Sequence, residues 1–244
     1  MSRDGGYDRY LTIFSPEGRL YQIEYAMKAV QSSGVLAVGV RGTDSVVLAC
    51  EKKVKDKMID PSSVTKLFNI TPKVGAVVVG YVADGQSVVQ RTRQEAAEFE
   101  YKNGYPMPAS IMAKRVADLA QVNTQHAGRR TMGTDIMLVS VDDEMGPQLY
   151  KVDPSGHYFG YMAVAAGSKN QEANTLLEKK VEENDAMNLE EAIRAAIMTL
   201  QQTAASDFKS DEIEIGIVAD SKSPFTRLSE AEIEDHLTAI AERD

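Results

Sequence analysis

The chain has 244 residues, enough for one core that buries roughly 70 to 75% of the surface exposed by the unfolded chain. Its 27 basic and 36 acidic residues give a formal net charge of −9, which disfavours nucleic acid as a partner because phosphates attract cations. The single cysteine, Cys50, allows no internal disulfide and fits a reducing compartment. It ends an apolar run, where a buried structural thiol is expected.

Membrane and export signals are not expected in this sequence. No apolar stretch approaches the ~20 residues of a membrane-spanning helix, and the first residues, MSRDGG, do not resemble a signal peptide. We therefore expect a protein of the cytoplasm and nucleus with no membrane partner.

The first motif covers residues 7–30, which read YDRYLTIFSPEGRLYQIEYAMKAV. A stretch with β-type preference precedes a turn at 15–18, where Ser-Pro-Glu-Gly has the residues that tight turns favour. The next apolar side chains recur at helical spacing, which predicts an amphipathic helix with one buried stripe: Leu20, Ile23, Met27 and Val30. Its other faces carry aromatic and charged groups that we expect to be available to another molecule, among them Tyr21, Glu24, Tyr25 and Lys28.

Short apolar segments then predict the strands of a core, at 35–40, 45–50, 67–70, 74–81, 135–141, 148–152, 159–164 and 213–218. Tight connections make several neighbours antiparallel. Helices are expected in pairs between the strands. The first pair covers 84–101 and the region of Met112–Leu119, and capping boxes open the later helices at Ser168 with Gln171, Asn188 with Glu191 and Ser229 with Glu232.

Paired strands, two helices, paired strands and two more helices do not alternate as in a parallel βαβ sheet. The order predicts an α+β fold, a four-layer αββα sandwich of two antiparallel sheets with helices outside. We find no linker, repeat or low-complexity segment. The chain is therefore expected to be one domain over 1–244, with an N-terminal tail and first helix at 1–33 and the sandwich core at 34–244.

Several segments together resemble the proteasome α-type subunits through nearly the whole chain. They are FSPEGRLYQIEYA and KAV in the first motif, Lys52–Val54, Val64–Phe68, Gln125–Gly133 and the closing Ala231–Asp244. The resemblance implies the N-terminal-nucleophile hydrolase fold and a place in the heptameric α ring of the 20S core particle. It also implies stacking on β-type subunits, gating of substrate admission and docking of activators or the regulatory particle in ATP- and ubiquitin-dependent protein degradation.

A nucleophile is missing where this fold would require one. An N-terminal nucleophile is activated by its own free α-amine, and the matching position at the head of the first strand is Val35. Glu51 and Lys66 match the acid and the lysine of the catalytic β-type subunits. We therefore expect no catalytic residues and no enzyme activity of the chain itself.

Two alternatives remain open from the sequence. A stand-alone hydrolase of the same fold requires hydrolysis by the isolated chain and its loss on mutation of a defined nucleophile. A monomeric α/β binding protein requires the first helix to fold back on its own core. The native mass of the purified material separates this second alternative from a ring.

The resemblance also assigns roles to individual residues. Tyr7, Asp8 and Arg9 match the tail element that fixes the closed or open gate, and Pro16 and Tyr25 match the positions that pack with it in the open arrangement. Lys66 matches the lysine of the pocket that receives the C-terminal tails of activators. In the mid-chain motif, Asn123 and Thr131 stand where the family usually has Tyr and Pro, and loss of the Pro is expected to loosen that loop.

No metal or cofactor is expected. His126, His157 and His236 are far apart in the sequence, without a paired ligand spacing. Gly128 and Gly133 have the spacing of a phosphate loop, but Thr134 follows where the essential lysine should be. The basic run Lys52–Lys57 is either a nuclear-import signal or a solvated loop, and the sequence leaves both possibilities open.

Overall fold

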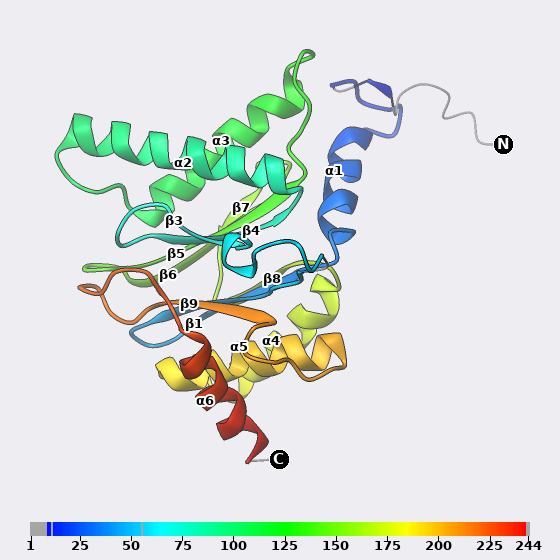
Figure 1. Ribbon diagram of the computed structural model, residues 1–244. Helices are drawn as coiled ribbons and strands as arrows, with labels where there is room; N and C mark the ends of the chain where they lie inside the picture. Colours follow the sequence, from blue (N-terminus) through cyan, green and yellow to red (C-terminus); the bar gives the residue numbers. More distant parts are fainter. Residues whose placement is uncertain (1–8, 11, 55, 243–244) are drawn as a thin grey trace.

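Two five-stranded antiparallel sheets form the centre of the computed structural model, which describes residues 9–10, 12–54 and 56–242 (Figure 1). The first sheet has the order β10-β9-β2-β1-β8 and consists of β1 (Leu36–Arg41), β2 (Val46–Glu51), β8 (Ala163–Gly167), β9 (Ile213–Val218) and β10 (Thr226–Arg227). The second has the order β3-β4-β5-β6-β7 and consists of β3 (Leu67–Asn69), β4 (Gly75–Gly80), β5 (Thr134–Asp142), β6 (Gly146–Val152) and β7 (Tyr158–Gly160).

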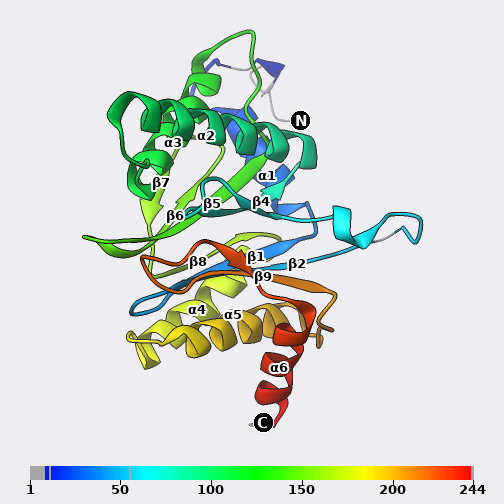
Figure 2. The same ribbon diagram turned by 60° about the vertical axis from the view of Figure 1, so that its left-hand side comes forward.

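Helices cover the outer faces of both sheets. The second sheet carries α2 (Val82–Asn103) and α3 (Ala109–Gln125), and the first carries α4 (Asn170–Glu183) and α5 (Leu189–Ala204), as Figures 1 and 2 show. The helix α1 (Tyr21–Gln31) lies at one end of the sandwich, and α6 (Glu230–Ala241) packs on α5. A short 3-10 helix, η2 (Pro61–Ser63), belongs to the loop that projects between β2 and β3 (Figure 2). The predicted αββα sandwich is confirmed.

The inner faces of the sheets pack on each other through fully buried apolar side chains, including Leu48, Val77, Met137 and Leu149. Phe225, which is 2% exposed, inserts between the sheets. Its ring covers Gly75 of β4 and Gly216 of β9, and a Cβ atom at either glycine would overlap the ring. These two strands need glycine because the aromatic ring occupies the space of their side chains.

The segment predicted as one strand at 159–164 is two strands in two sheets. β7 pairs with β6, whereas β8 pairs with β1. The crossing lies between two adjacent residues: the Tyr161 N–H donates to Leu149 O in the second sheet, and Met162 O accepts from the Arg41 N–H in the first, both at 2.8 Å. An apolar run continues through the crossing, so the sequence pattern does not show where the chain changes sheet.

Two capping boxes are confirmed and one is wrong. Asn188 with Glu191 and Ser229 with Glu232 form both reciprocal hydrogen bonds at the starts of α5 and α6. At α4 the N-cap is Lys169, in the left-handed region with φ +52°, and it makes no side-chain cap. The Ser168 N–H instead donates to Val35 O at 2.9 Å, because this residue joins β8 to the head of β1. The two-residue strand β10 was also not predicted.

Candidate functional site

The turn before α1 is closed by its own hydrogen bonds. The Gly18 N–H donates to Ser15 O at 2.8 Å, with Gly18 at φ +77°, and the Ser15 N–H donates to Arg19 O at 2.9 Å. The Ser15 hydroxyl also accepts from the Arg19 N–H at 3.1 Å. These bonds leave Pro16 exposed at the tip of the turn.

Charged and aromatic side chains of α1 and of the turn before it contact one another. Arg19 donates to Glu24 at 2.8 Å and lies 4.8 Å from the centroid of the Tyr21 ring. The Tyr21 ring stacks on Tyr25 with centroids 6.3 Å apart. The hydrogen bond from Arg19 lowers the pKa of the Glu24 carboxyl. Tyr25 is 41% exposed, with its ring against that of the buried Tyr21.

The structure places only part of the expected gate element. Arg9, Pro16 and Tyr25 are exposed, whereas Tyr7 and Asp8 lie outside the described residues. Tyr21, Ala26 and Val30 form the buried stripe of α1, which faces β4, β5 and β8. The predicted surface helix is present, but its buried stripe differs from the predicted one. Val30 is buried as expected, whereas Leu20, Ile23 and Met27 are only half-buried and Tyr21, expected outward, is 8% exposed. Tyr25 and Lys28 are exposed as expected.

The head of β1 holds Val35 in an unbroken backbone that leads from α1 into the strand. The next residue, Leu36, donates its N–H to Glu51 Oε2 at 2.9 Å. The same carboxylate oxygen accepts from the Lys53 ammonium at 2.8 Å, and this ammonium also donates to Gly34 O at 2.8 Å. Valine offers no nucleophilic atom, and the acid beside it is already paired.

Glu51 and Lys66, which match the acid and the lysine of the catalytic β-type subunits, do not form an ion pair with each other in the structure. The Lys66 N–H donates to Glu214 Oε2 at 3.0 Å, which fixes the backbone at the end of the projecting loop. The Lys66 side chain is half-buried, and no ion pair found in the described residues involves its ammonium.

Comparison with known proteins decides the family. Residues 32–218 match the proteasome subunit family, and residues 7–29 match the N-terminal signature of A-type proteasome subunits. The chain belongs to the proteasome α-type subunit family. It is 50% identical to the probable alpha type-1 proteasome subunit of Schizosaccharomyces pombe and 43% identical to the alpha type-6 proteasome subunit of Caenorhabditis elegans, each over 100% of both chains. It is 40% identical to the alpha proteasome subunit of Pyrococcus horikoshii, over 96% of this chain and 88% of that protein.

This proteasome α-type chain also contains an ion pair that sequence reasoning missed. Asp84, in the first turn of α2, accepts from the Arg130 guanidinium at 2.7 Å and from the Gly133 N–H at 3.0 Å. The hydrogen bond from Arg130 lowers the pKa of this buried carboxyl. The loop before β5, expected to be loosened by Thr131 in place of proline, is thus anchored to α2. The two partners are 46 positions apart, so local patterns give no signal for them.

The single cysteine of the proteasome α-type chain lies in its core. Cys50 is fully buried, and burial raises the pKa of its thiol, as expected for a packed core cysteine. In the part of the chain that the structure describes, His, Cys, Asp and Glu side chains form no group of three or more suited to a metal ion. Among these same residues, no helix has the length and apolar character needed to cross a bilayer.

Proposed function

We propose that this chain is a non-catalytic subunit of the outer α ring of the 20S core particle. The observation that carries the proposal is the head of β1, where Val35 lies within a continuous backbone and Lys53 pairs with Glu51. An N-terminal-nucleophile reaction requires a hydroxyl or thiol next to a free α-amine. Neither group is present at this position, and the residues that precede it form the turn and α1.

The segment before β1 takes the place of the catalytic start and serves as part of the gate. Arg9, Pro16 and Tyr25 are exposed, and Tyr25 stacks on Tyr21, whose ring the Arg19 guanidinium covers. A rigid aromatic group on a folded helix is a suitable contact for a neighbouring tail, because little conformational entropy is lost on binding. In this proposal Tyr7 and Asp8 complete the element with these residues.

Lys66 docks the C-terminal carboxylate of an activator. Its backbone is anchored to Glu214, and its half-buried ammonium has no acidic partner in the described residues. Partial burial strengthens an ion pair relative to one at the open surface. Capture of a terminal carboxylate is an established form of peptide recognition.

The experiment compares Lys66→Ala and Lys66→Glu in assembled particles with Lys73→Ala, an exposed lysine in the turn between β3 and β4. Activator affinity and activator-stimulated peptide hydrolysis are measured. Loss of the ion pair should weaken activator binding about 3- to 10-fold, with a larger effect for the charge reversal, while Lys73→Ala should leave it unchanged. Unchanged affinity and gate opening in both Lys66 variants would exclude this docking role.

The partners in this proposal are other α-type subunits in a heptameric ring, the β-type subunits beneath them and activators or the regulatory particle. The process is ATP- and ubiquitin-dependent protein degradation, in the cytoplasm and nucleus. Imaging of a fluorescent fusion in cells tests the location. Exclusion of the assembled fusion from either compartment would contradict that part of the proposal.

A further inference from the structure

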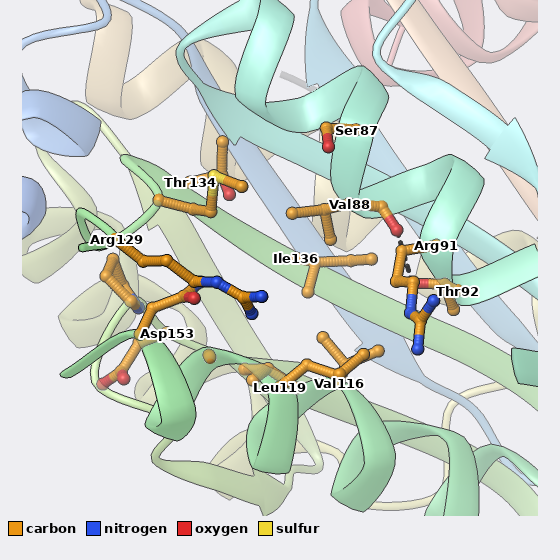
Figure 3. Close-up of a pocket in the computed structure, with 15 residues that line it drawn as sticks. Ser87, Val88, Arg91, Thr92, Val116, Leu119, Arg129, Thr134, Ile136 and Asp153 are labelled. Atoms are coloured by element: carbon orange, nitrogen blue, oxygen red, sulfur yellow. Dashed lines mark hydrogen bonds between the residues drawn. The ribbon is translucent and has the colours of Figure 1, made fainter. Parts of the chain in front are cut away.

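A cavity of about 500 Å³ lies between α2, α3 and the outer face of the second sheet (Figure 3). The described gate and docking residues Arg9, Pro16, Tyr25 and Lys66 do not line it. Its size is typical of small-molecule sites, which are commonly 300–1,000 Å³. The apolar part of its wall comes from both helices, from β5 and β6 and from the loop before β5: Val88, Val116, Leu119, Met132, Ile136 and Val152. Such a wall suits an aliphatic or aromatic group.

Among the described residues, one positive charge that faces this cavity has no hydrogen-bond or ion-pair partner for its side chain. The Arg129 guanidinium extends into it (Figure 3), and no side-chain hydrogen bond or ion pair of Arg129 occurs within the described chain. The second arginine of the wall, Arg91, is paired with Glu95 at 2.6 Å and also donates to Gln94 at 3.1 Å. Arg129 is therefore the available cation.

Asp153, the carboxylate found among the described residues of the wall, is engaged elsewhere. Asp153 Oδ1 accepts from the Ser155 N–H and hydroxyl at 2.9 and 2.6 Å and from the His157 N–H at 3.2 Å. In Figure 3 the Asp153 carboxylate points away from the Arg129 guanidinium. The cavity thus combines an apolar wall with an uncompensated positive charge, which selects an anionic ligand with an apolar body.

The backbone that carries Arg129 is held in place before any ligand binds. The next residue, Arg130, forms the ion pair with Asp84, and Gly133 donates to the same carboxylate. The Arg129 N–H also donates to His126 O at 3.0 Å. A preorganised backbone reduces the ordering cost of binding. Met132, beside it, is flexible and can adapt the wall to a ligand's shape.

We propose that this cavity binds a small aliphatic monocarboxylate, with the carboxylate paired to Arg129 and the chain lying along Val116, Leu119 and Ile136. Guanidinium and carboxylate match in a bidentate, charge-assisted hydrogen bond. The apolar wall favours a hydrocarbon body over a polyol or a nucleotide. Each added methylene should tighten binding about fourfold until the cavity is filled.

The test is calorimetric titration of the full-length chain with butanoate, hexanoate and octanoate, and with octanamide as the uncharged counterpart of octanoate. Saturable binding that tightens along the series is expected, with octanamide weaker than octanoate. Arg129→Gln should weaken octanoate about 3- to 10-fold and leave octanamide unchanged. Lys73→Gln, which removes an equal charge from an exposed turn, should change neither.

A second variant tests the cavity itself. Ala120→Phe adds a ring to the wall on α3 and should abolish binding of both ligands. Thermal unfolding shows whether the Ala120→Phe variant is folded. If it is not folded, the Arg129→Gln variant and the chain-length series test the proposal. Absence of saturable binding to the wild-type chain, or equal octanoate affinity for wild type and Arg129→Gln, would overturn the proposal. Neither result depends on the gate or on docking at Lys66.

Discussion

The Leu36 N–H donates to the Glu51 carboxylate at 2.9 Å, directly after the position where an N-terminal nucleophile would lie. Lys53 donates to the same oxygen at 2.8 Å. The acid that the sequence matches to a catalytic residue therefore supports the head of β1. Its partners are a backbone amide and a nearby lysine, whereas Lys66 is bound elsewhere through its backbone.

Introducing a hydroxyl at this position should not create a hydrolase. Val35→Thr in the full-length chain supplies an Oγ atom, but its nitrogen remains in a peptide bond and cannot act as a free amine. Hydrolysis of fluorogenic peptides by the purified variant should equal that of the wild-type chain. Hydrolysis that appears with Val35→Thr and disappears again on adding Glu51→Gln would contradict the non-catalytic assignment.

Asp84→Asn should destabilise the fold by about 1.5–3 kcal/mol, because the variant replaces a buried carboxylate that accepts charge-assisted hydrogen bonds. Denaturant unfolding at neutral pH measures the loss. Asp118→Asn, which breaks an exposed pair with Lys114, is the matched control and should change stability by less than about 1 kcal/mol. If Asp84→Asn also changes stability by less than about 1 kcal/mol, the result contradicts a structural role of the Asp84–Arg130 pair.

The same variant should alter the acid dependence of stability. Arg130 lowers the pKa of Asp84 in the folded chain, so its stabilisation is complete above the unfolded pKa of about 3.9. The stabilisation is lost as the pH falls through the lower, folded pKa. The stability difference between wild type and Asp84→Asn should therefore be constant near neutrality and shrink below about pH 4. A difference that grows on acidification has the wrong sign for this assignment.

Gly216→Ala should cost about 1–3 kcal/mol, because its methyl group would overlap the Phe225 ring. Phe225→Ala should cost about 3–5 kcal/mol through the cavity that it leaves between the sheets. In the Phe225→Ala background, Gly216→Ala should cost almost nothing, a coupling that denaturant unfolding of all four proteins measures. If the costs of Gly216→Ala and Phe225→Ala add in the double variant, the Phe225 ring is not the reason that position 216 requires glycine. Phe159→Ala, at a 56% exposed site, is the control for loss of an aromatic group.

Ala205→Gly should stabilise the chain by about 0.5–1 kcal/mol. Ala205 ends α5 in the left-handed region with φ +54°, a conformation that costs a non-glycine residue about 1–2 kcal/mol. Glycine adopts this conformation without the steric cost. Part of the gain is offset, because glycine makes the unfolded chain more flexible and so loses more entropy on folding. Ala97→Gly, at an exposed position inside α2, should have the opposite sign. Destabilisation by both substitutions would contradict strain at Ala205.

The sequence predicts best those features that are local. The capping boxes at Asn188 and Ser229 and the β1–β2 hairpin follow from neighbouring residues, and all are confirmed. The change of sheet after Tyr161 depends on hydrogen bonds to Leu149 and Arg41, which are distant in the chain, so an apolar run cannot indicate it.

In the candidate site, too, local features could be predicted from the sequence and contacts between distant residues could not. The amphipathic pattern predicted the exposed Tyr25, whereas the partner of Glu51 depends on tertiary geometry. Lys53 reaches its carboxylate, and the Lys66 ammonium makes no ion pair in the described chain. The Asp84–Arg130 pair likewise joins elements that no short motif connects.

We propose that this chain works as a non-catalytic member of a gated α ring. Electron microscopy of particles isolated from cells through a tag on this chain, with native mass measurement of the same material, tests it most directly. We expect stacked rings with this chain at one defined place in a heptameric outer ring. A 26.7 kDa monomer in the cell extract, with no ring-bound population, would contradict it.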